Sequence, residues 1–316
     1  MSLETLVKTV SRIARGHDRE RLADWAEQHH IHARQDLRDA LDPIFDKLYY
    51  SPSLEVSRDF AQRLRIRWSQ LPLVEGSANH MKGRRLFFEP IPLTLLGRMP
   101  LKREDGGTGK RVRAMDGLWA RQESGMCGEY SQAGVVADTL IHEFGLYERV
   151  VSMDASHTLQ ELSGWVQCWP GREIQDQKYM RPTKYTSEAD RCLTPWNARF
   201  ADTWHRDDAR PHRTVILEHS VLGSEGLQRS EVLVIIGLMR ERLAGYTLLE
   251  NKVIPVQIIS CMNGFKARIL QAHFWYGELI IYKSWLYDFS TPEERGVNVP
   301  LFLRYLASRP VGDTAG

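Results

Sequence analysis

The sequence has no long apolar run and no apolar segment at its start. No stretch of its 316 residues approaches the ~18 consecutive apolar residues expected of a membrane-spanning helix. The first residues carry charges at Glu4, Lys8, Arg12 and Arg15 and lack the apolar core of a secretory signal. The sequence therefore predicts a soluble protein of the cytoplasm that has no membrane partner.

Cysteine is scarce. The four cysteines, Cys127, Cys168, Cys192 and Cys261, lie far apart and form no C-x-x-C pair. This spacing argues against a zinc site and against a compact disulfide framework, and it is typical of reduced cytosolic thiols. The three histidines of segment 29–32 have no nearby Asp, Glu or Cys pattern, which favours a solvated surface over a metal site. We therefore expect no metal and no cofactor.

Net charge is small, at +2 with histidine neutral, so the chain as a whole gives no polyanion-binding signal. The basic residues are, however, 32 Arg against 10 Lys. Arginine suits bidentate contacts to phosphate and carboxylate, although the compositional bias of a GC-rich genome explains the same excess equally well. With 42% hydrophobic and 26% charged residues, the chain can bury one large core or two modest ones.

Helical periodicity dominates the first part of the chain. Apolar residues recur at spacings of three and four in segments 3–13, 21–28, 36–50 and 54–71. We therefore predict a helical N-terminal region, residues 1–71, and an α+β catalytic domain, residues 72–316, which together form one continuous globular unit.

Strand-like runs with tight turns dominate the C-terminal half. Segments 254–260, 266–274 and 278–283 are joined by Asn263-Gly264 and Tyr276-Gly277, as in an antiparallel meander. The repeated alternation of strand and helix that builds a parallel doubly wound sheet is missing. We predict an α+β fold in which the N-terminal helices and a central helix pack on a mainly antiparallel sheet of residues 149–169 and 254–283.

Further elements are expected on either side of this centre. A strand is expected at 215–222, and helices at 230–243 and 299–308. Residues 102–113 are rich in glycine and basic residues and predict a mobile cationic loop. Residues 170–213 are polar and irregular, which is typical of a long loop that covers a site.

Cys127 is the strongest candidate for chemistry. Gly125 and Gly128 flank it, and apolar residues then recur at helical spacing as far as Gly145. This pattern places Cys127 at a helix N-terminus, where unpaired amides and the helix dipole favour a thiolate. A cysteine in an apolar helix is, however, also commonly a small buried hydrophobe, so the nucleophile and the structural reading are equally good.

Residues around this cysteine resemble the transglutaminase-like cysteine fold, and most closely the peptide N-glycanases. The resemblance rests on Cys127-Gly128-Glu129-Tyr130-Ser131, on Gly145-Leu-Tyr-Glu-Arg149-Val-Val151, and on His157 with Glu161 four residues later. It covers about 45 residues. It implies a Cys127 nucleophile, a His157 base and catalytic roles for Glu129 and Glu161. Trp169 stands where the family has the aspartate that orients the histidine, which weakens a hydrolase interpretation.

The last hundred residues carry a second resemblance. The order IPVQIIS, ARILQAHF, GELIIYKSWLYDFS and LFLRYLASRPVGDT is similar to a group of fungal proteins that includes the arginine-containing cyclodipeptide synthases. The resemblance implies an ascomycete source, a role in secondary metabolism and arginyl-tRNA as a substrate. Cys127 would then hold the first aminoacyl group, and His157 would free the amine of the second.

Substrate contacts are predicted from residue type. A carboxylate such as Glu129, Glu161 or Asp154 would meet the arginine guanidinium, and Tyr130 and Trp165 would line the pocket. Five basic residues are expected either to contact the phosphates of RNA or to be plain solvated surface: Arg84, Arg85, Lys110, Arg111 and Arg113.

Two alternative functions remain open at the level of sequence. The first is a transglutaminase-like cysteine amidase that hydrolyses peptide or glycopeptide amides. The second is a non-catalytic binding module whose catalytic triad is degenerate.

Overall fold

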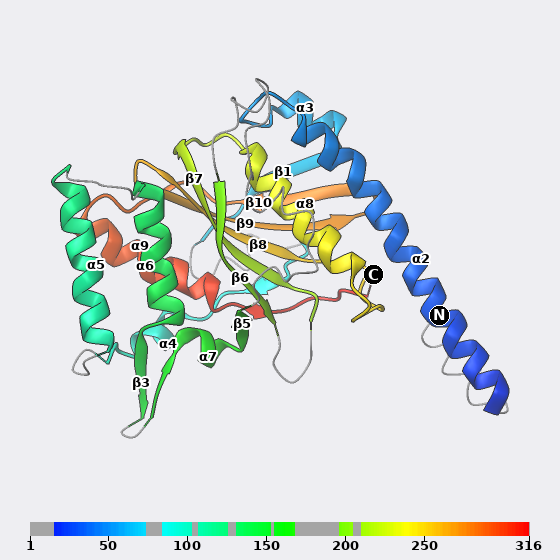
Figure 1. Ribbon diagram of the computed structural model, residues 1–316, viewed down its shortest axis with the longest axis horizontal. Helices are drawn as coiled ribbons and strands as arrows, with labels where there is room; N and C mark the ends of the chain where they lie inside the picture. The colour runs from blue at the N-terminus through cyan, green and yellow to red at the C-terminus, as the bar shows by residue number, and fades with distance from the viewer. Residues whose placement is uncertain are drawn as a thin grey trace.

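A mixed sheet of eight strands forms the centre of the protein (Figure 1). The structure is a computed structural model that describes residues 16–73, 84–102, 107–125, 131–152, 155–167, 196–204 and 210–315. Across the sheet the strands follow the order β1 (Ile66–Gln70), β10 (Glu278–Lys283), β9 (Lys266–Trp275), β8 (Val256–Asn263), β7 (Arg213–Leu222), β6 (Trp196–Trp204) and β5 (Trp165–Gln167), and β11 (Tyr287–Asp288) pairs with β9. Only the pairs β1 with β10 and β7 with β8 are parallel within this sheet. The predicted α+β fold with a mainly antiparallel sheet is therefore confirmed.

The central strands are buried on both faces, and alternate side chains enter two different hydrophobic clusters. Along β7, Val215 and Leu217 point into the first cluster and Ile216 into the second. Along β8, Ile258 and Ile259 divide in the same way. This alternation follows from the two-residue period of a strand, and it requires helices on both faces of the sheet.

Two groups of helices cover these faces. The first cluster is closed by α2 (Gly16–Tyr49) and α8 (Arg229–Ala244), which pack on each other, and by α3 (Arg58–Arg63). The second is closed by α6 (Gln132–Gly145), α9 (Pro292–Leu306) and the side chain of Trp119 from α5 (Thr108–Glu123). Figure 1 shows α5, α6 and α9 together on one side of the molecule and α2 and α8 on the other.

The C-terminal meander is built as the sequence predicts. The turn between β8 and β9 has positive φ at Gly264 (79°) and Phe265 (54°), and the turn between β9 and β10 has positive φ at Tyr276 (47°) and Gly277 (75°). Two consecutive positive φ values match the right-handed twist of the flanking strands in a two-residue hairpin. Helix α8 provides the crossover between the parallel strands β7 and β8.

The N-terminal region differs from the prediction in two places. The expected helices 21–28 and 36–50 are parts of the single helix α2, and the expected helix 3–13 lies outside the described residues. Of the expected helix 54–71, only α3 forms. It ends where Arg65 takes a φ of 54°, and β1 follows in parallel with β10. Leucines 41 and 48 of α2 are fully buried in the first cluster, so the helices and the sheet share one core. The boundary between residues 71 and 72 stays a prediction.

The middle of the chain also differs from the prediction. Half of the expected cationic loop 102–113 is helix, because α5 begins at Thr108. The expected long loop 170–213 contains β6 and the start of β7. Strands β3 (Glu148–Ser152) and β4 (Ala155–Thr158) form a separate hairpin rather than part of the main sheet.

Short elements complete the fold. The helix α7 (Leu159–Ser163) follows β4, and α4 (Leu93–Gly97) packs against α9. Strand β2 (Phe88–Glu89) pairs with β12 (Arg309–Pro310). Within the described parts of the chain, no helix combines the length and the apolar character that a bilayer crossing requires.

Candidate functional site

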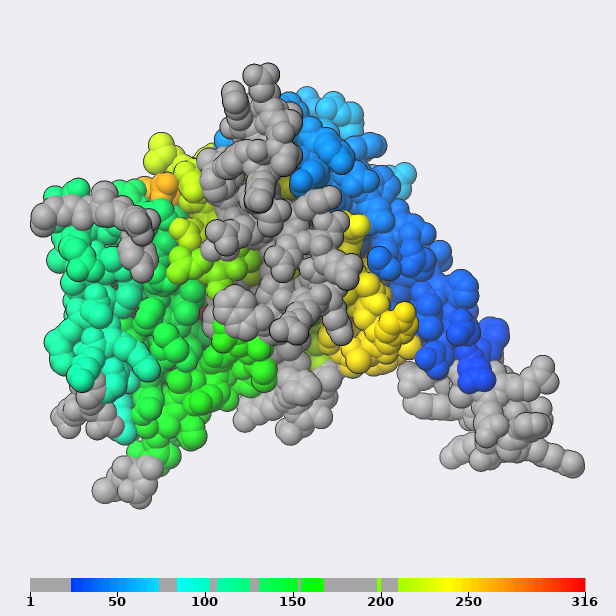
Figure 2. All heavy atoms as spheres, in the orientation of Figure 1, coloured from blue at the N-terminus to red at the C-terminus, as the bar shows by residue number. Residues whose placement is uncertain are grey.

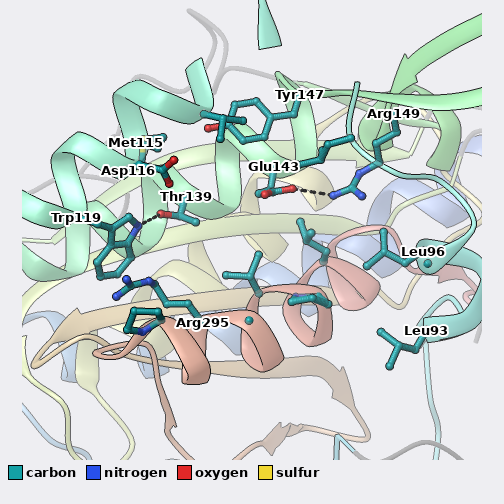
Figure 3. A pocket seen from close by; sticks show the side chains of 18 of the residues that line it. Leu93, Leu96, Met115, Asp116, Trp119, Thr139, Glu143, Tyr147, Arg149 and Arg295 are labelled. Carbon is teal, nitrogen blue, oxygen red and sulfur yellow. Dashed lines mark hydrogen bonds and ion pairs between the residues drawn. The ribbon is translucent and has the colours of Figure 1, made fainter. Parts of the chain in front are cut away.

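A pocket of about 760 Å³ lies between α5, α6, α9 and α4 (Figure 3). Its wall is largely apolar, and the aliphatic side chains come from three helices: Leu93, Leu96, Met115, Val299 and Leu303. A Cβ added at Gly296 of α9 would meet nothing within 4 Å, so the hollow reaches the backbone of that helix. A concave, mostly apolar pocket with a few convergent polar groups is the usual form of a small-molecule site.

One end of the pocket is held by Trp119 and Arg295. The indole Nε1 of Trp119 donates to Thr139 Oγ1 at 3.0 Å. The Arg295 guanidinium lies 4.1 Å from the centre of the Trp119 ring and donates to Glu123 Oε1 at 2.8 Å. Arg295 also donates to the carbonyls of Phe289 and Ser290. This arginine is therefore committed to neighbours, and its charge is balanced by Glu123.

The other end is held by Arg149 and Glu143. Arg149 donates to Glu143 Oε2 at 2.7 Å and to the carbonyl of Met99 at 3.1 Å. The side chains are 7% and 19% exposed, so the ion pair is largely shielded from water. Burial lowers the pKa of Arg149 while Glu143 opposes that shift. The pair is thus a structural brace that supplies no spare charge to the pocket.

Asp116 is the third carboxylate of the pocket, and its situation is different. It lies at an exposed position on α5, next to Met115, and forms neither an ion pair nor a hydrogen bond with any residue that the structure describes. Its charge is felt at Tyr147, a buried pocket residue whose pKa is raised first by burial and then by Glu143 and Asp116. One carboxylate of the pocket therefore remains uncompensated.

This arrangement suits an amphipathic cation. An aliphatic stem would bury against the leucines and Met115, while Asp116 would accept hydrogen bonds from a guanidinium or an ammonium group. Trp119 and Tyr147 add two aromatic rings to the lining, but both rings are buried, and the Arg295 guanidinium already lies over the face of Trp119.

Four of the predicted site residues, Cys127, Glu129, Tyr130 and Asp154, lie outside the described residues. The central helix begins at Gln132 rather than at the cysteine, because the N-cap is Ser131. The expectation that Cys127 opens this helix is therefore wrong by several residues. The cysteine belongs to the connection between Gly125, just after α5, and Ser131.

The start of α6 is fixed by a polar cluster. Ser131 Oγ accepts from the amide of Gly134 at 2.9 Å and donates to Glu218 Oε1 at 2.5 Å. Arg199 donates to Glu218 at 2.8 Å and to Asp138 at 2.6 Å. Burial raises the pKa of Asp138, and Arg199 opposes that rise. The cluster anchors the first two turns of α6 to β6 and β7, immediately after the segment that contains Cys127.

His157 lies on β4, directly opposite Arg149 on β3. Its Nδ1 is 3.6 Å from Glu161 Oε2, and the two side chains are 51% and 63% exposed. Glu161 also accepts from the amide of Thr158 at 2.9 Å, and it thereby completes the capping box of α7. Glu161 is therefore engaged mainly in holding a helix end.

Ser131, the N-cap of α6, and His157, on the hairpin that follows the helix, lie at opposite ends of α6. The helix has 14 residues, a length of about 21 Å at ~1.5 Å per residue. Cys127 precedes its N-terminus, whereas the β3–β4 hairpin follows its C-terminus, and Figure 1 shows that hairpin at the far end of the helix from β7's tip. The pocket reaches from Glu123, at the end of α5, to Arg149 on β3, which lies opposite His157 on β4. Direct contact between the two residues stays a prediction.

Trp165 is not a wall of this pocket. It is 2% exposed, donates from Nε1 to the carbonyl of Ser308 at 2.8 Å and stacks on Phe88. Its place in the second hydrophobic cluster contradicts the expectation that it lines the site.

The predicted basic residues lie on different elements. Arg84 donates to the carbonyl of Gln70 at 2.7 Å and lies over Tyr282, and Arg85 lies 3.6 Å from the ring centre of Trp275. Lys110, Arg111 and Arg113 lie in the first turns of α5, where Arg111 donates to the carbonyl of Leu146. Lys110, Arg111 and Arg113 thus lie on a helix rather than on the expected mobile loop, and contact of either basic group with RNA stays a prediction.

The sequence patterns did not reveal the pocket residues Asp116, Trp119, Glu143 and Arg295. They come from three helices that are separated in the chain, and no periodic signal links them. Among the lining residues, Tyr147 and Arg149 fall within a motif recognised in the sequence. Neither models of known protein families, nor curated proteins, nor solved structures match this chain.

Proposed function

We propose that this protein is an acyltransferase that forms an arginine-containing cyclic dipeptide from aminoacyl-tRNAs. The pocket between α5, α6 and α9 would hold the arginine side chain, and Cys127 would carry the acyl group. The reaction would take place in the cytoplasm of a fungus, as part of secondary metabolism.

The observation that supports this proposal is Asp116 in an apolar-walled pocket. The other two carboxylates of the lining are matched by Arg149 and Arg295, so Asp116 gives the pocket a local excess of negative charge. An arginine side chain combines three methylene groups with a guanidinium, which complements an apolar wall that bears one carboxylate. Asp116 would therefore fill the role that the sequence assigned to Glu129, Glu161 or Asp154.

The chemistry would run in three acyl transfers. Cys127 loses its thiol proton to solvent, and the thiolate attacks the ester carbonyl of arginyl-tRNA; an S–C bond forms, the bond to the terminal ribose oxygen breaks, and that oxygen takes a proton from solvent as the tRNA leaves. The amine of the second aminoacyl-tRNA attacks the thioester and expels the thiolate, and the amine proton passes to solvent, or to His157 where that residue reaches Cys127. The arginyl amine then attacks the second ester and closes the ring with a C–N bond, while the bond to the ribose oxygen of the second tRNA breaks and that oxygen takes up the amine proton.

A transglutaminase-like amidase is the second candidate. It is favoured by the carboxylate of Glu161, 3.6 Å from His157 Nδ1, which could orient the imidazole in place of the aspartate that the sequence lacks. This candidate gives no role to the cation-binding character of the pocket.

The test is expression of the chain in a host with ordinary tRNAs, followed by mass spectrometry of the medium for arginine-containing cyclic dipeptides. We expect product from the intact chain. Cys127→Ala should reduce it at least roughly tenfold, the lower end of what loss of a covalent nucleophile costs. Asp116→Asn should lower the share of arginine-containing product, because the neutral amide removes the charge that meets the guanidinium.

The matched control is Asp36→Asn, which removes one carboxylate from an exposed position of α2 far from the pocket. It should leave the product unchanged. Absence of any cyclic dipeptide, together with cleavage of a peptide or glycopeptide amide, would replace this proposal with the amidase. Absence of both activities, with cation binding retained, would leave a binding module.

A further inference from the structure

A second hollowed region lies on the other side of the molecule, where α3 meets β1 and the end of α2. It consists of a groove of about 430 Å³ and an adjoining hollow of about 220 Å³ that share Arg65 in their lining. Five cationic side chains line the two: Lys47, Arg58, Arg63, Arg65 and Arg67. We call these five residues the α3–β1 basic surface. In Figure 1 it lies in the region of the elements labelled α3 and β1, and in Figure 2 this part of the chain lies in the blue region at the upper right.

Negative charge is almost absent from these linings. Glu278 is the one acidic residue among those that line the two hollows, so five positive charges face one negative charge. The whole chain has a net charge of only +2. A local excess of this size raises the concentration of anions at the surface and steers them toward it.

Most of these cations are not committed to protein partners. Arg67 donates to Glu278 at 2.9 Å, but that arginine side chain is 72% exposed and the pair is open to water. Arg63 lies 5.6 Å from the ring centre of Phe60. The side chains of Arg58 and Arg65 make no hydrogen bond or ion pair within the part of the chain that the structure describes. These guanidinium groups can therefore present their paired N–H donors to an external acceptor.

The backbone conformation of Arg65 supports the interpretation of this surface as a binding site. Its φ of 54° lies in the left-handed region, which costs a non-glycine residue about 1 kcal/mol and is more easily adopted by glycine or asparagine. An arginine at such a position places its side chain between the two hollows. Strained positions of this kind gather at binding and switching sites.

An exposed aromatic platform adjoins the arginines. Tyr276 is 88% exposed at the β9–β10 turn, and the next residue, Gly277, lines the smaller hollow. The ring of Trp275 lies 4.8 Å from that of Tyr276, and Arg85 covers Trp275 at 3.6 Å. A large, uncovered tyrosine beside several arginines offers a base both a stacking face and neighbouring phosphate contacts.

We propose that the α3–β1 basic surface, with Tyr276, binds a single-stranded stretch of RNA. Arginine matches phosphate oxygens in bidentate fashion, and Arg65 and Arg67 stand two residues apart along the chain, so their side chains can contact successive phosphates. The concave linings favour a strand that enters the hollows over a flat lipid surface. This inference rests on the proposed function only in that the RNA would be the tRNA substrate; the residues themselves are independent of the pocket.

The test measures binding of a fluorescently labelled RNA hairpin with a single-stranded 3′ tail by anisotropy, at several salt concentrations. The variant Arg58→Gln/Arg65→Asn removes two charges, and asparagine tolerates the positive φ at residue 65. We expect affinity to fall at least roughly fivefold, and the slope of log K against log salt to shrink by about 1.4, or ~0.7 for each lost phosphate contact. Tyr276→Asn should weaken binding roughly fivefold or more with the slope unchanged, because it removes stacking and no charge.

The matched control is Arg98→Gln/Arg121→Gln, which removes two charges from exposed positions of α4's end and α5. Equal affinity and equal slope for the surface variant, the control and the unaltered chain would overturn the inference. So would binding of phosphatidylserine vesicles that depends on these arginines while RNA does not bind. If the chain forms the cyclic dipeptide but its RNA binding does not depend on the α3–β1 basic surface, only this inference is overturned. If RNA binding depends on that surface but no dipeptide is formed, only the proposed function is overturned.

Discussion

The two hollowed regions of the molecule both contain arginine, but the arginines are paired with carboxylates in one region and mostly unpaired in the other. In the pocket between α5, α6 and α9, Arg149 and Arg295 are each held by a glutamate within 2.8 Å. On the α3–β1 basic surface, only Arg67 has a carboxylate partner, and that pair is largely exposed. The same residue type therefore serves as a structural brace in one place and as a free donor in the other.

The difference shows that arginine content alone does not locate an anion site. An arginine is available to bind an anion only when its guanidinium is not already paired with a nearby carboxylate. Among the charged side chains that line the pocket, one carboxylate, Asp116, is in excess, so the pocket suits a cation. On the basic surface the balance leaves several guanidinium groups in excess, so it suits an anion.

Acid should destabilise the fold as a whole, and with it both hollowed regions, because the fold contains three buried histidines. Burial lowers the pKa of His212, His219 and His273 to about 4 each, against an ordinary value near 6.5. The unfolded chain therefore binds more protons than the folded one between pH 6.5 and 4. The stability of the fold is complete above pH 6.5 and is lost as pH falls toward 4, by up to about 3 kcal/mol for each histidine.

Urea unfolding measured across this pH range checks the prediction. His219→Gln should flatten the pH dependence, because His219 is fully buried between Ser260 and Ser230. His29→Gln, at an exposed position of α2, is the control and should leave the dependence as it is. A free energy of unfolding that stays constant from pH 6.5 to 4 would contradict the assignment of neutral buried histidines.

Removing one arginine from each region should separate the two roles. Arg149→Met leaves Glu143 largely buried without its partner, so we expect a loss of about 3 kcal/mol or more in the free energy of unfolding. Arg67→Met removes an exposed pair and should cost less than about 1 kcal/mol. Denaturant unfolding of the two variants gives the comparison directly, and equal losses would show that the pocket pair is not a brace.

Salt should distinguish the two sites by their binding. If all five cations of the basic surface contact phosphates of a single strand, raising salt from 50 to 200 mM should weaken RNA binding by roughly a hundredfold. Binding of a small monovalent cation in the pocket involves one carboxylate and should change by less than about threefold. Anisotropy measures the binding of RNA, and calorimetry on the same preparation measures the binding of the cation. An equal salt dependence of the two would contradict the difference in charge between the regions.

The smallest expected difference concerns two helix caps. Ser131 caps α6 beside the pocket helices and also contacts Glu218, whereas Ser57 caps α3 at the basic surface with a single bond to Phe60. Ser131→Ala should cost about 1–2 kcal/mol, because it removes the cap and leaves Glu218 short of a donor, and Ser57→Ala about 0.5–1 kcal/mol. Thermal unfolding of both variants checks the order. A larger loss of stability for Ser57→Ala than for Ser131→Ala would indicate that the polar cluster around Arg199 does not strengthen the cap of α6.

Much of the fold could be predicted from the sequence wherever local signals agree. The strands from 256 to 283 follow from runs of apolar residues that end in Asn263-Gly264 and Tyr276-Gly277, and these turns fix the pairing. Strand β1 was missed because Leu64, Trp68 and Leu71 recur at spacings of four and three, which continue the helical pattern of α3. Its state is decided by pairing with β10, more than two hundred residues later, which no local pattern reports.

The site could be predicted only in part. Cys127 and His157 stand out in the sequence because their residue types carry chemistry, and their catalytic roles stay predictions. Arg149, which does line the pocket, stands out because it belongs to a motif. Asp116 looks like any surface carboxylate on α5, and its meaning depends on the pairing of Glu123 with Arg295 across the pocket. The basic surface was missed for a similar reason, since Lys47, Arg63 and Arg65 come together only when α2, α3 and the start of β1 meet.

The most direct test of the pocket is a calorimetric titration with n-butylguanidinium, which carries an aliphatic stem and one guanidinium. The neutral compound n-butylurea, of the same shape, serves as the control ligand. We predict that the guanidinium binds more tightly than the urea, and that Asp116→Asn weakens its binding at least roughly tenfold, as expected for the loss of a charge-assisted hydrogen bond. Asp36→Asn should bind as the unaltered chain does. Equal binding of the two ligands, or guanidinium binding that is unchanged in Asp116→Asn, would contradict the assignment of this pocket to a cationic side chain.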